Sequence, residues 1–271
     1  MVKLRHIAVL GGLLAGGIIG FVPVKVPAAE PAKQTQPAIS EEASATLQRM
    51  GQTLRAEQLS FQARTIRVYA EPKGEPLHIF HTLKVTMRRP NRLLAEVSGD
   101  DGSSKIVFDG KTAILYSAAQ NKYASIAVPE GTIAGLLKEA VGRLGVDFPL
   151  ADFLSDEPGN AFLSGVTSGR VVNTVTIDGG PYDHLFFFQP PGIELELWVA
   201  KNEQSLPRRL IVTYRSLPGQ PNFIAQFSDW NFNVRTPDAD FAFQPPAGAT
   251  QVELKPVAAA APPAAKKKGS K

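Results

Sequence analysis

The sequence predicts a mainly β protein with a few helices, built around one large curved antiparallel sheet. Its 271 residues include 23 glycines and 22 prolines, a combination typical of chains with many turns. Apolar and polar residues alternate along 77–87 and 193–199, which indicates strands with one buried and one solvated face. Strands do not alternate regularly with helices along the chain, which disfavours a doubly wound fold.

Clusters of turn residues separate the expected strands. Gly, Asp and Pro gather at 99–102, 109–111, 178–181 and 190–192. The chain between these turns predicts ten to twelve strands in an antiparallel meander. The expected strands are 62–71, 77–87, 92–98, 104–109, 112–117, 121–127, 170–177, 182–189, 193–199, 207–215, 222–234 and 240–244.

Two helices are expected to cover the concave side of this sheet. The first runs over about 41–58, because Ser40 suits an N-cap and acidic residues follow it. The second lies near 130–143, where apolar residues recur at helical spacing. Two helices are too few to cover ten or more strands, so an apolar cavity is expected to remain on the concave side.

The apolar positions of these helices and of two strands are the candidate ligand-binding residues. The helices would act as lids, and the strands would form the walls. Trp198 is out of phase with Leu195 and Leu197, so it belongs to the other face unless a bulge intervenes. The candidates are Leu47, Met50, Leu54, Leu83, Val85, Leu136, Leu137, Leu195, Leu197 and Trp198.

Positive charge is concentrated at the two ends of the chain. The formal net charge is +4, but residues 1–28 contribute +3 and residues 256–271 contribute +4. The body between them, 29–255, therefore carries −3. Because the positive net charge comes from the two ends of the chain, it does not indicate a nucleic-acid-binding face on the folded body. No nucleic-acid partner is expected.

The first 28 residues resemble a cleaved Sec-type signal peptide, which predicts export to the periplasm. Lys3 and Arg5 precede an uncharged apolar stretch, and small residues near Ala28 suit a signal peptidase. The apolar stretch of 7–22 is short for a bilayer span of about 20 residues. The alternative is an uncleaved anchor in the inner membrane.

The rest of the chain divides into three parts. Residues 29–40 are expected to be a disordered linker, 41–251 a single domain, and 252–271 a disordered tail rich in Ala, Pro and Lys. The tail lysines suit weak contact with an anionic membrane surface. The chain has no cysteine, so disulfides, thiolate metal sites and a lipidated cysteine are all excluded. A monomer is expected.

No catalytic residue, metal site or cofactor is expected, and the protein is not expected to be an enzyme. His78 and His81 lie three apart on a strand, so they point to opposite faces and make a poor metal pair. Glu194 and Glu196 share a strand face, but they alternate with apolar residues as a solvated face does. The sequence contains no phosphate-binding loop, dinucleotide fingerprint or Gly-x-Ser-x-Gly motif.

Five motifs, in order over about 43–251, resemble those of a bacterial family of predicted periplasmic proteins of unknown function. That family in turn resembles the LolA/LolB-like lipoprotein-carrier superfamily. The resemblance implies an unclosed β-barrel of about eleven strands with a helical lid and a cavity for acyl chains. By position, Arg64 or Arg67 is nearest to the carrier's ligand-handling arginine, although the local pattern differs. The motifs are Arg89-Pro90-Asn91-Arg92-Leu93, Phe108-Asp109-Gly110-Lys111-Thr112, Pro149-Leu150-Ala151-Asp152-Phe153-Leu154, Leu206-Pro207-Arg208-Arg209-Leu210 and Phe241 to Ala249.

Two functions follow as hypotheses. The first is a periplasmic, non-catalytic protein that binds or carries a hydrophobic ligand, a lipid or the acyl chains of a lipoprotein, on the concave side of the sheet. The alternative is an envelope sensor or protein-interaction module that uses the same sheet without an acyl ligand. The expected partners are accordingly a lipid or lipidated protein, or an envelope protein.

Overall fold

The computed structural model describes residues 38–71, 73–146 and 148–254, which contain twelve strands and four α-helices. Strands and tight turns alternate along most of the chain, as the alternation of polarity and the turn residues predict. The strands are β1 (Gln58–Ala70), β2 (Pro76–Arg88), β3 (Arg92–Gly99), β4 (Gly102–Phe108), β5 (Thr112–Ser117), β6 (Lys122–Ala127), β7 (Ser168–Ile177), β8 (Gly180–Gln189), β9 (Ile193–Ala200), β10 (Pro207–Tyr214), β11 (Asn222–Asn231) and β12 (Thr250–Val252).

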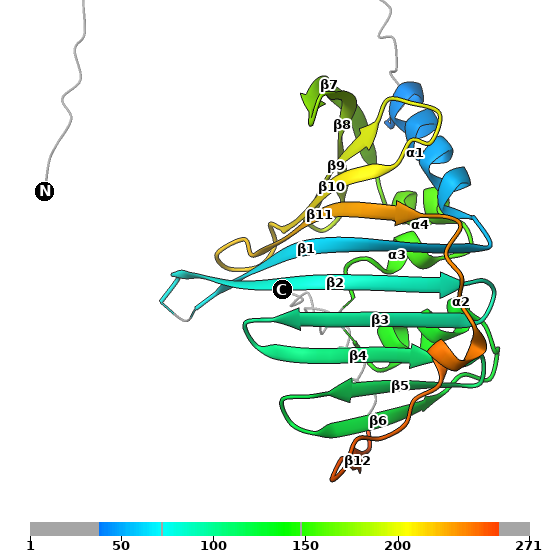
Figure 1. Cartoon of the computed structure of the whole chain (residues 1–271). Coiled ribbons are helices and arrows are strands. Elements are labelled where there is room, and N and C mark those ends of the chain that lie inside the picture. The colour runs from blue at the N-terminus through cyan, green and yellow to red at the C-terminus, as the bar shows by residue number, and fades with distance from the viewer. Residues whose placement is uncertain (1–37, 72, 147, 255–271) are drawn as a thin grey trace, which may run out of the picture. The chain divides into compact units, whose positions relative to one another are not determined.

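All twelve strands form one curved sheet in the order β12-β6-β5-β4-β3-β2-β1-β11-β10-β9-β8-β7 (Figure 1). Two meanders, β1 to β6 and β7 to β11, are joined where β1 pairs with β11. Eleven strands pair antiparallel, and the short β12 adds to β6 in parallel. The strands β12 and β7 are the two ends of the described sheet, so the prediction of an unclosed antiparallel sheet of about eleven strands is confirmed.

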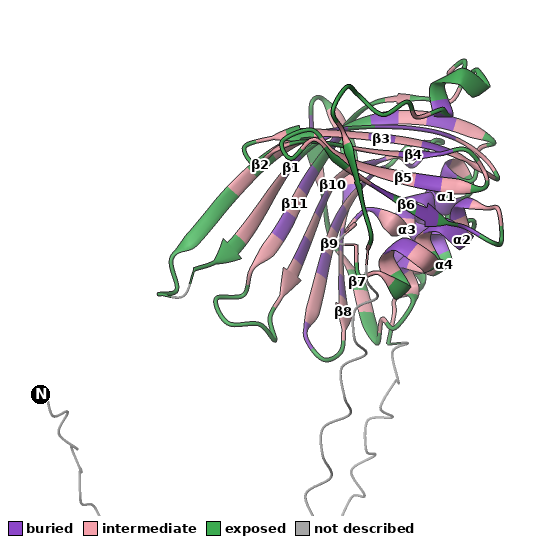
Figure 2. Cartoon of the chain, turned by 90° about the horizontal axis from the view of Figure 1, so that it is seen from below, coloured by how far each residue is buried: buried purple, intermediate pink, exposed green. Residues whose placement is uncertain are grey.

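The helices lie against the concave face of the sheet, near one end of the strands (Figures 1 and 2). They are α1 (Glu41–Leu54), α2 (Ile133–Leu137), α3 (Ala151–Leu154) and α4 (Pro158–Leu163), and α2 continues into the π-helix η1 (Lys138–Arg143). The Ser40 hydroxyl caps α1 by accepting from the Ala43 N–H, 3.3 Å away. Close approach of α1 and α4 needs glycine, since a Cβ on Gly51 would lie 2.6 Å from the Gly159 nitrogen.

The strand register shows which rows of side chains on the concave face lie beneath the helices and which lie beyond them. Side chains from six neighbouring strands form one apolar row beneath the helices, and every member is buried. The next rows along the strands are less covered, because the helices end before them. The buried row is Leu59, Met87, Leu93, Phe108, Ala113 and Ile126.

Several local predictions were wrong. The helix expected over 41–58 ends at Leu54, because β1 begins at Gln58. The strand expected at 240–244 is replaced by the 3₁₀ helix η2 (Asp238–Phe241) and a segment with Pro245 and Pro246, which cannot donate to a ladder. The short helices α3 and α4 were not expected, because four and six residues are too few to show a helical period.

The expected boundaries of the domain also shift. Residues 38–40 were placed in the linker, but Ile39 forms a parallel bridge with Gly169. Val252 was placed in the tail, but it ends β12. The expected signal peptide (1–28), the rest of the expected linker (29–37) and the expected tail beyond Leu254 lie outside the described residues. Among the described residues, no helix is long and apolar enough to cross a bilayer.

Candidate functional site

A cavity of about 470 Å³ lies on the concave face, beyond the end of the helical cover. Its volume falls within the range of roughly 300–1,000 Å³ that small-molecule sites occupy. The floor comes from strands β1 to β6 and β11. Further lining comes from Val146, Phe148, Pro149, Leu150, Val252 and Leu254. The cavity is therefore a product of the long curved sheet and of helices that cover only part of it.

The floor of the cavity is apolar and made partly of small residues. Ala95 and Ala124 lie between larger aliphatic neighbours, and both are buried. Small side chains in the middle of a sheet leave room above them, which larger residues would fill. The apolar residues of the floor are Leu83, Ala95, Val97, Ile106, Leu115, Ala124 and Phe223, and those facing them are Val146, Phe148 and Leu150.

One corner of the mouth gathers polar and charged groups, and we name it the Arg67 corner: Thr65, Arg67, His81, Asp101 and Phe223. Thr65 pairs in register with His81, and Arg67 pairs with Phe223. The Arg67 guanidinium carbon lies 5.3 Å from the centre of the Phe223 ring, within cation–π range. All five residues line the cavity.

A tight turn supplies the acid of this corner. Asp101 lies in the β3–β4 hairpin, and its Oδ1 is 2.7 Å from Nε2 of His81. The His81 side chain is 15% exposed and that of Asp101 is 61% exposed, so the carboxylate lies on the outer side of the imidazole. Gly99 permits this approach, since a Cβ there would lie 2.2 Å from the Phe80 carbonyl oxygen.

Of the ten candidate residues from the sequence, Leu83 lines this cavity and the other nine do not. Most of the nine pack into the core where helices and sheet meet, and Leu137 there is only partly buried. The helices pack tightly onto the sheet instead of standing above an open space. The buried members of the set are Leu47, Met50, Leu54, Val85, Leu136, Leu195 and Leu197.

Trp198 lies on the opposite, convex face of the sheet, as its phase relative to Leu195 and Leu197 indicated. Its ring stacks on that of His184, with centroids 4.1 Å apart and planes 8° apart. Nε2 of His184 lies 2.9 Å from a carboxylate oxygen of Glu196. Trp198 is thus a member of a surface cluster and not a wall of the cavity.

Apart from Arg67, which the family resemblance raised, sequence reasoning missed the polar residues of the mouth and the lining residues Val146, Phe148 and Leu150. The alternation along β1 and β2 carried part of the signal, because Thr65, Arg67 and His81 share the phase of buried neighbours. Where polar residues replace apolar ones toward the end of a buried strand face, they indicate that the helices no longer cover that part of the sheet. Of the two arginines raised by the family resemblance, Arg67 faces the cavity, whereas Arg64 is exposed and has the opposite phase.

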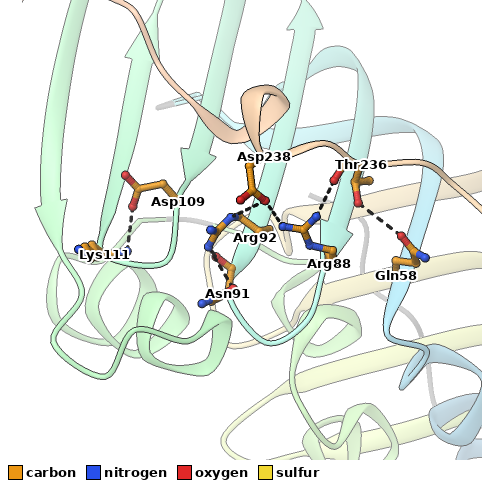
Figure 3. Close-up of polar contacts among 8 residues, drawn as sticks. All are labelled: Gln58, Arg88, Asn91, Arg92, Asp109, Lys111, Thr236 and Asp238. Carbon is orange, nitrogen blue, oxygen red and sulfur yellow. Dashed lines mark hydrogen bonds and ion pairs between the residues drawn. The ribbon is translucent and has the colours of Figure 1, made fainter.

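A second cluster of charged residues lies at the helix-covered end of the sheet (Figure 3). Arg88 donates to the Thr236 carbonyl oxygen, 2.7 Å away, and forms an ion pair with Asp238. Nε of Arg92 lies 3.6 Å from the same carboxylate. The Arg88 guanidinium lowers the pKa of Asp238 below its usual range. These bonds fasten the segment between β11 and β12 across the strand ends.

Arg89 joins the helical layer to the sheet at the same end. It donates to the carbonyl oxygens of Leu54 and Leu154, at 3.2 and 3.1 Å, and to Asp156. Leu54 and Leu154 are the last residues of α1 and α3, where carbonyl groups lack partners within the helix. The motif residues Arg89 and Arg92 therefore hold the architecture, and both Nη groups of Arg89 donate to the protein itself.

The lining of the cavity provides an apolar surface with polar groups at its edge. Among the described residues, no group of three or more His, Asp or Glu side chains could hold a metal ion. His81 bonds to Asp101, and no hydrogen bond in the described part of the chain links it to a hydroxyl nucleophile. An apolar floor with a polar rim is suited to an amphiphilic ligand.

Asp152, in α3, gives a pH-dependent prediction. Burial raises the pKa of its carboxyl, so the native state holds this proton more tightly than the unfolded chain. The contribution of the protonated Asp152 carboxyl to the free energy of unfolding is present at low pH and is lost as pH rises through the native pKa. Asp152→Asn should therefore raise the Tm at pH 7, by an amount that shrinks toward about pH 4. Thermal melts across pH check this, with the exposed Asp240→Asn as the control; equal shifts in both variants would contradict it.

Comparison with known proteins places the chain in a family. The family described as "Predicted periplasmic protein (DUF2092)" matches residues 43–255. No curated protein sequence matches. Solved structures with a similar fold include the lipoprotein LppX of Mycobacterium tuberculosis, 16% identical, with a TM-score of 0.44 over 72% of this chain and 99% of that one.

Two further solved structures are similar over most of the chain. The LolA superfamily protein NE2245 of Nitrosomonas europaea is 10% identical, with a TM-score of 0.34 over 74% of this chain and 97% of that one. The MucA/MucB complex of Pseudomonas aeruginosa contains a chain that is 17% identical, with a TM-score of 0.40 over 75% of this chain and 61% of that one.

Proposed function

This chain belongs to the DUF2092 family of predicted periplasmic proteins, and from that premise we propose that it binds or carries a hydrophobic ligand. The ligand is a lipid or the acyl chains of a lipoprotein, held in the cavity on the concave face. The protein performs no catalysis. Membership confirms the family that the sequence motifs indicated and agrees with the periplasmic location expected from the N-terminus.

The observation that carries this proposal is the apolar floor of the cavity. Five neighbouring strands contribute aliphatic side chains at matching register positions, so the floor is continuous across β2 to β6. An alkyl chain that leaves water for such a surface gains about 0.8 kcal/mol for each CH₂ group buried. The polar rim keeps a head group in water while the chain is covered.

Material that copurifies with the protein tests the proposal. The full chain is expressed with export to the periplasm, purified without detergent, and examined by native mass spectrometry and by lipid analysis of an organic extract. We expect bound species with alkyl chains at a substantial fraction of one per protein molecule. Protein that leaves the periplasm unliganded, and that also fails to bind added lipids, would contradict the proposal.

A hairpin arm favours the protein-interaction alternative as a second candidate function. The strands β1 and β2 continue beyond their last pairings with β11 and β3, so residues 68–71 and 73–80 project past the neighbouring strands (Figure 1). Figure 2 shows this end as exposed. Tyr69, Leu77 and Phe80 are 46%, 45% and 52% exposed there, a concentration of apolar surface typical of docking sites.

Variants of the arm separate the two functions. If the arm docks onto an envelope protein, Leu77→Ser combined with Phe80→Ser should reduce crosslinked partners at least fivefold in cells. Retention of ligand should not change, because neither residue lines the cavity. Val172→Ser is the matched control, since Val172 is 42% exposed on the distant strand β7. Identical crosslinking patterns for both variants would remove the arm as a docking element.

A further inference from the structure

The convex face of the sheet carries a row of apolar side chains, which we name the convex row: Ile211, Ile224, Ile66 and Phe80. Ile211 on β10 pairs in register with Ile224 on β11, and Ile224 pairs with Ile66 on β1. Phe80 on β2 pairs with Ile66 and continues the row. The isoleucines are half-buried and Phe80 is 52% exposed. The described helices lie on the concave face, so they do not cover this row.

A groove of about 480 Å³ lies over the convex row, and its lining includes Ile66, Ile224 and Phe80. Along β1 and β11, the two isoleucines alternate with Thr65 and Phe223, which line the cavity on the concave face. Alternate residues of a strand point to opposite faces of a sheet, so the groove and the cavity are separate sites. An apolar surface continuous over four strands and open to solvent is typical of a docking surface.

The acids next to the convex row are engaged by the protein itself. The Asp100 carboxylate accepts from the Phe80 N–H, 3.0 Å away. Glu196 pairs in register with Ile211, and its carboxylate lies 2.9 Å from Nε2 of His184. These carboxylates therefore already have donors beside them.

The cations near the convex row have no such partners. Arg64 and Arg209 lie in the next row, one on each side of Gln226, and Lys84 lies one row further along β2. Within the described part of the chain, the side chains of Arg64, Arg209 and Lys84 make no hydrogen bond or ion pair. Neighbouring strands lie about 4.8 Å apart, so the strands of the two arginines are separated by roughly 10 Å. The groove is thus bordered by positive charge that the protein leaves unpaired.

This charge distinguishes among the possible occupants of the groove. A second copy would place the same cations against one another, and residues 256–271 of the chain carry +4, so charge disfavours both. The isoleucines are less exposed than Arg64, so a flat bilayer would meet the arginine before the floor of the groove. A protein segment with carboxylates beside aliphatic side chains matches both the charge and the depth of the groove.

We propose that the convex face docks an acidic segment of another envelope protein. Aliphatic side chains of that segment lie in the groove over Ile66 and Ile224, and its carboxylates bind at the unpaired cations beside the row. The proposal goes beyond the binding of a ligand in the cavity, and it gives the second candidate function a partner of stated chemistry. Phe80 belongs both to the convex row and to the hairpin arm, so the two surfaces are continuous.

Fluorescence anisotropy of labelled peptides titrated with the full chain tests this proposal. The probes are a peptide of leucine and glutamate, one with lysine in place of glutamate, and one with serine in place of leucine, all of equal length. We expect the leucine–glutamate peptide to bind at least tenfold more tightly than the other two. Arg209→Glu should reduce its affinity at least fivefold. Arg235→Glu is the matched control, because Arg235 is exposed in the segment after β11, away from the groove.

A second variant tests the apolar row itself. Ile66→Thr combined with Ile224→Thr keeps β-branched side chains, which suit strands, but removes the apolar floor. It should reduce the affinity for the leucine–glutamate peptide at least tenfold. The amount of ligand that copurifies should not change, because neither residue lines the cavity. Thermal melts show whether this variant is folded, and the surface variant Arg209→Glu tests the same site without touching the row.

The outcomes separate this proposal from its competitors. Equal binding of the three peptides, or equal effects of Arg209→Glu and Arg235→Glu, overturns the proposal. Vesicles containing phosphatidylglycerol that bind more tightly than the leucine–glutamate peptide, and lose binding in Arg209→Glu, would assign the face to a membrane. A dimer that dissociates in the isoleucine double variant would assign it to a second copy. Ligand binding in the cavity is tested separately by copurification, so its failure would leave the docking proposal standing.

Discussion

Val97→Trp should lower the amount of ligand that copurifies with the protein at least tenfold. Val97 is partly buried in the middle of the cavity floor, between Leu83 on β2 and Ser104 on β4. An indole at this place occupies the space through which an alkyl chain would pass. Because the side chain enters a cavity instead of a packed core, the cost in stability should stay below the roughly 1–3 kcal/mol of overpacking.

The next residue of the same strand supplies the control. Ser98 is exposed and faces the opposite side of the sheet, so Ser98→Trp adds the same indole without entering the cavity. Native mass spectrometry of both variants measures ligand occupancy, and urea unfolding measures stability. If Val97→Trp keeps the occupancy of Ser98→Trp, the cavity is not the place where ligand binds.

Arg89→Ala should cause the largest loss of stability among single changes to charged side chains. It would leave the carbonyl oxygens of Leu54 and Leu154 without their donor. An unsatisfied buried polar group costs about 1–3 kcal/mol, so two of them predict a loss of about 2–6 kcal/mol in the free energy of unfolding. The ends of α1 and α3 would lose their common attachment to the sheet.

Arg55→Ala is the corresponding surface control. Arg55 forms an ion pair with Glu157 at 3.2 Å, and both side chains are 53% exposed. Exposed pairs of this kind contribute roughly 0–1 kcal/mol. Urea unfolding at neutral pH should therefore separate the two variants clearly. A similar small loss in both would mean that water replaces Arg89 at the helix ends.

The organisation of the sheet could be read from the sequence because it depends on local alternation. Leu83 and Val85 share the buried face that their spacing indicated, and Trp198 lies on the other face. Turn residues indicated where the hairpins lie, and the segments between them were predicted as the strands of an antiparallel sheet. The short helices α3 and α4 gave no periodic signal, and η2 replaced an expected strand where prolines and a buried Phe241 oppose extended pairing.

The site itself was predicted in kind but not in its residues. An apolar cavity on the concave side was expected from a shortage of helical cover, and a cavity lies there. The leucines of α1 and α2 pack against the sheet, so the part of the concave side beneath them belongs to the core and not to the cavity. The lining includes Arg67 from β1, Asp101 from a turn and the loop residues Val146, Phe148 and Leu150, which only the tertiary structure brings together.

The sequence by itself determined the class of the protein, namely an exported, cysteine-free chain with a one-sided antiparallel sheet and no sign of catalytic machinery. The alternation of side chains and the residue preferences of turns depend on only a few neighbouring residues, so they can be recognised in the sequence without knowledge of the fold. The tertiary structure decided how far along the strands the helices extend, and therefore which rows are core and which are cavity. That depends on contacts between residues tens of positions apart, such as Arg89 with the ends of α1 and α3. No local pattern in the sequence encodes it.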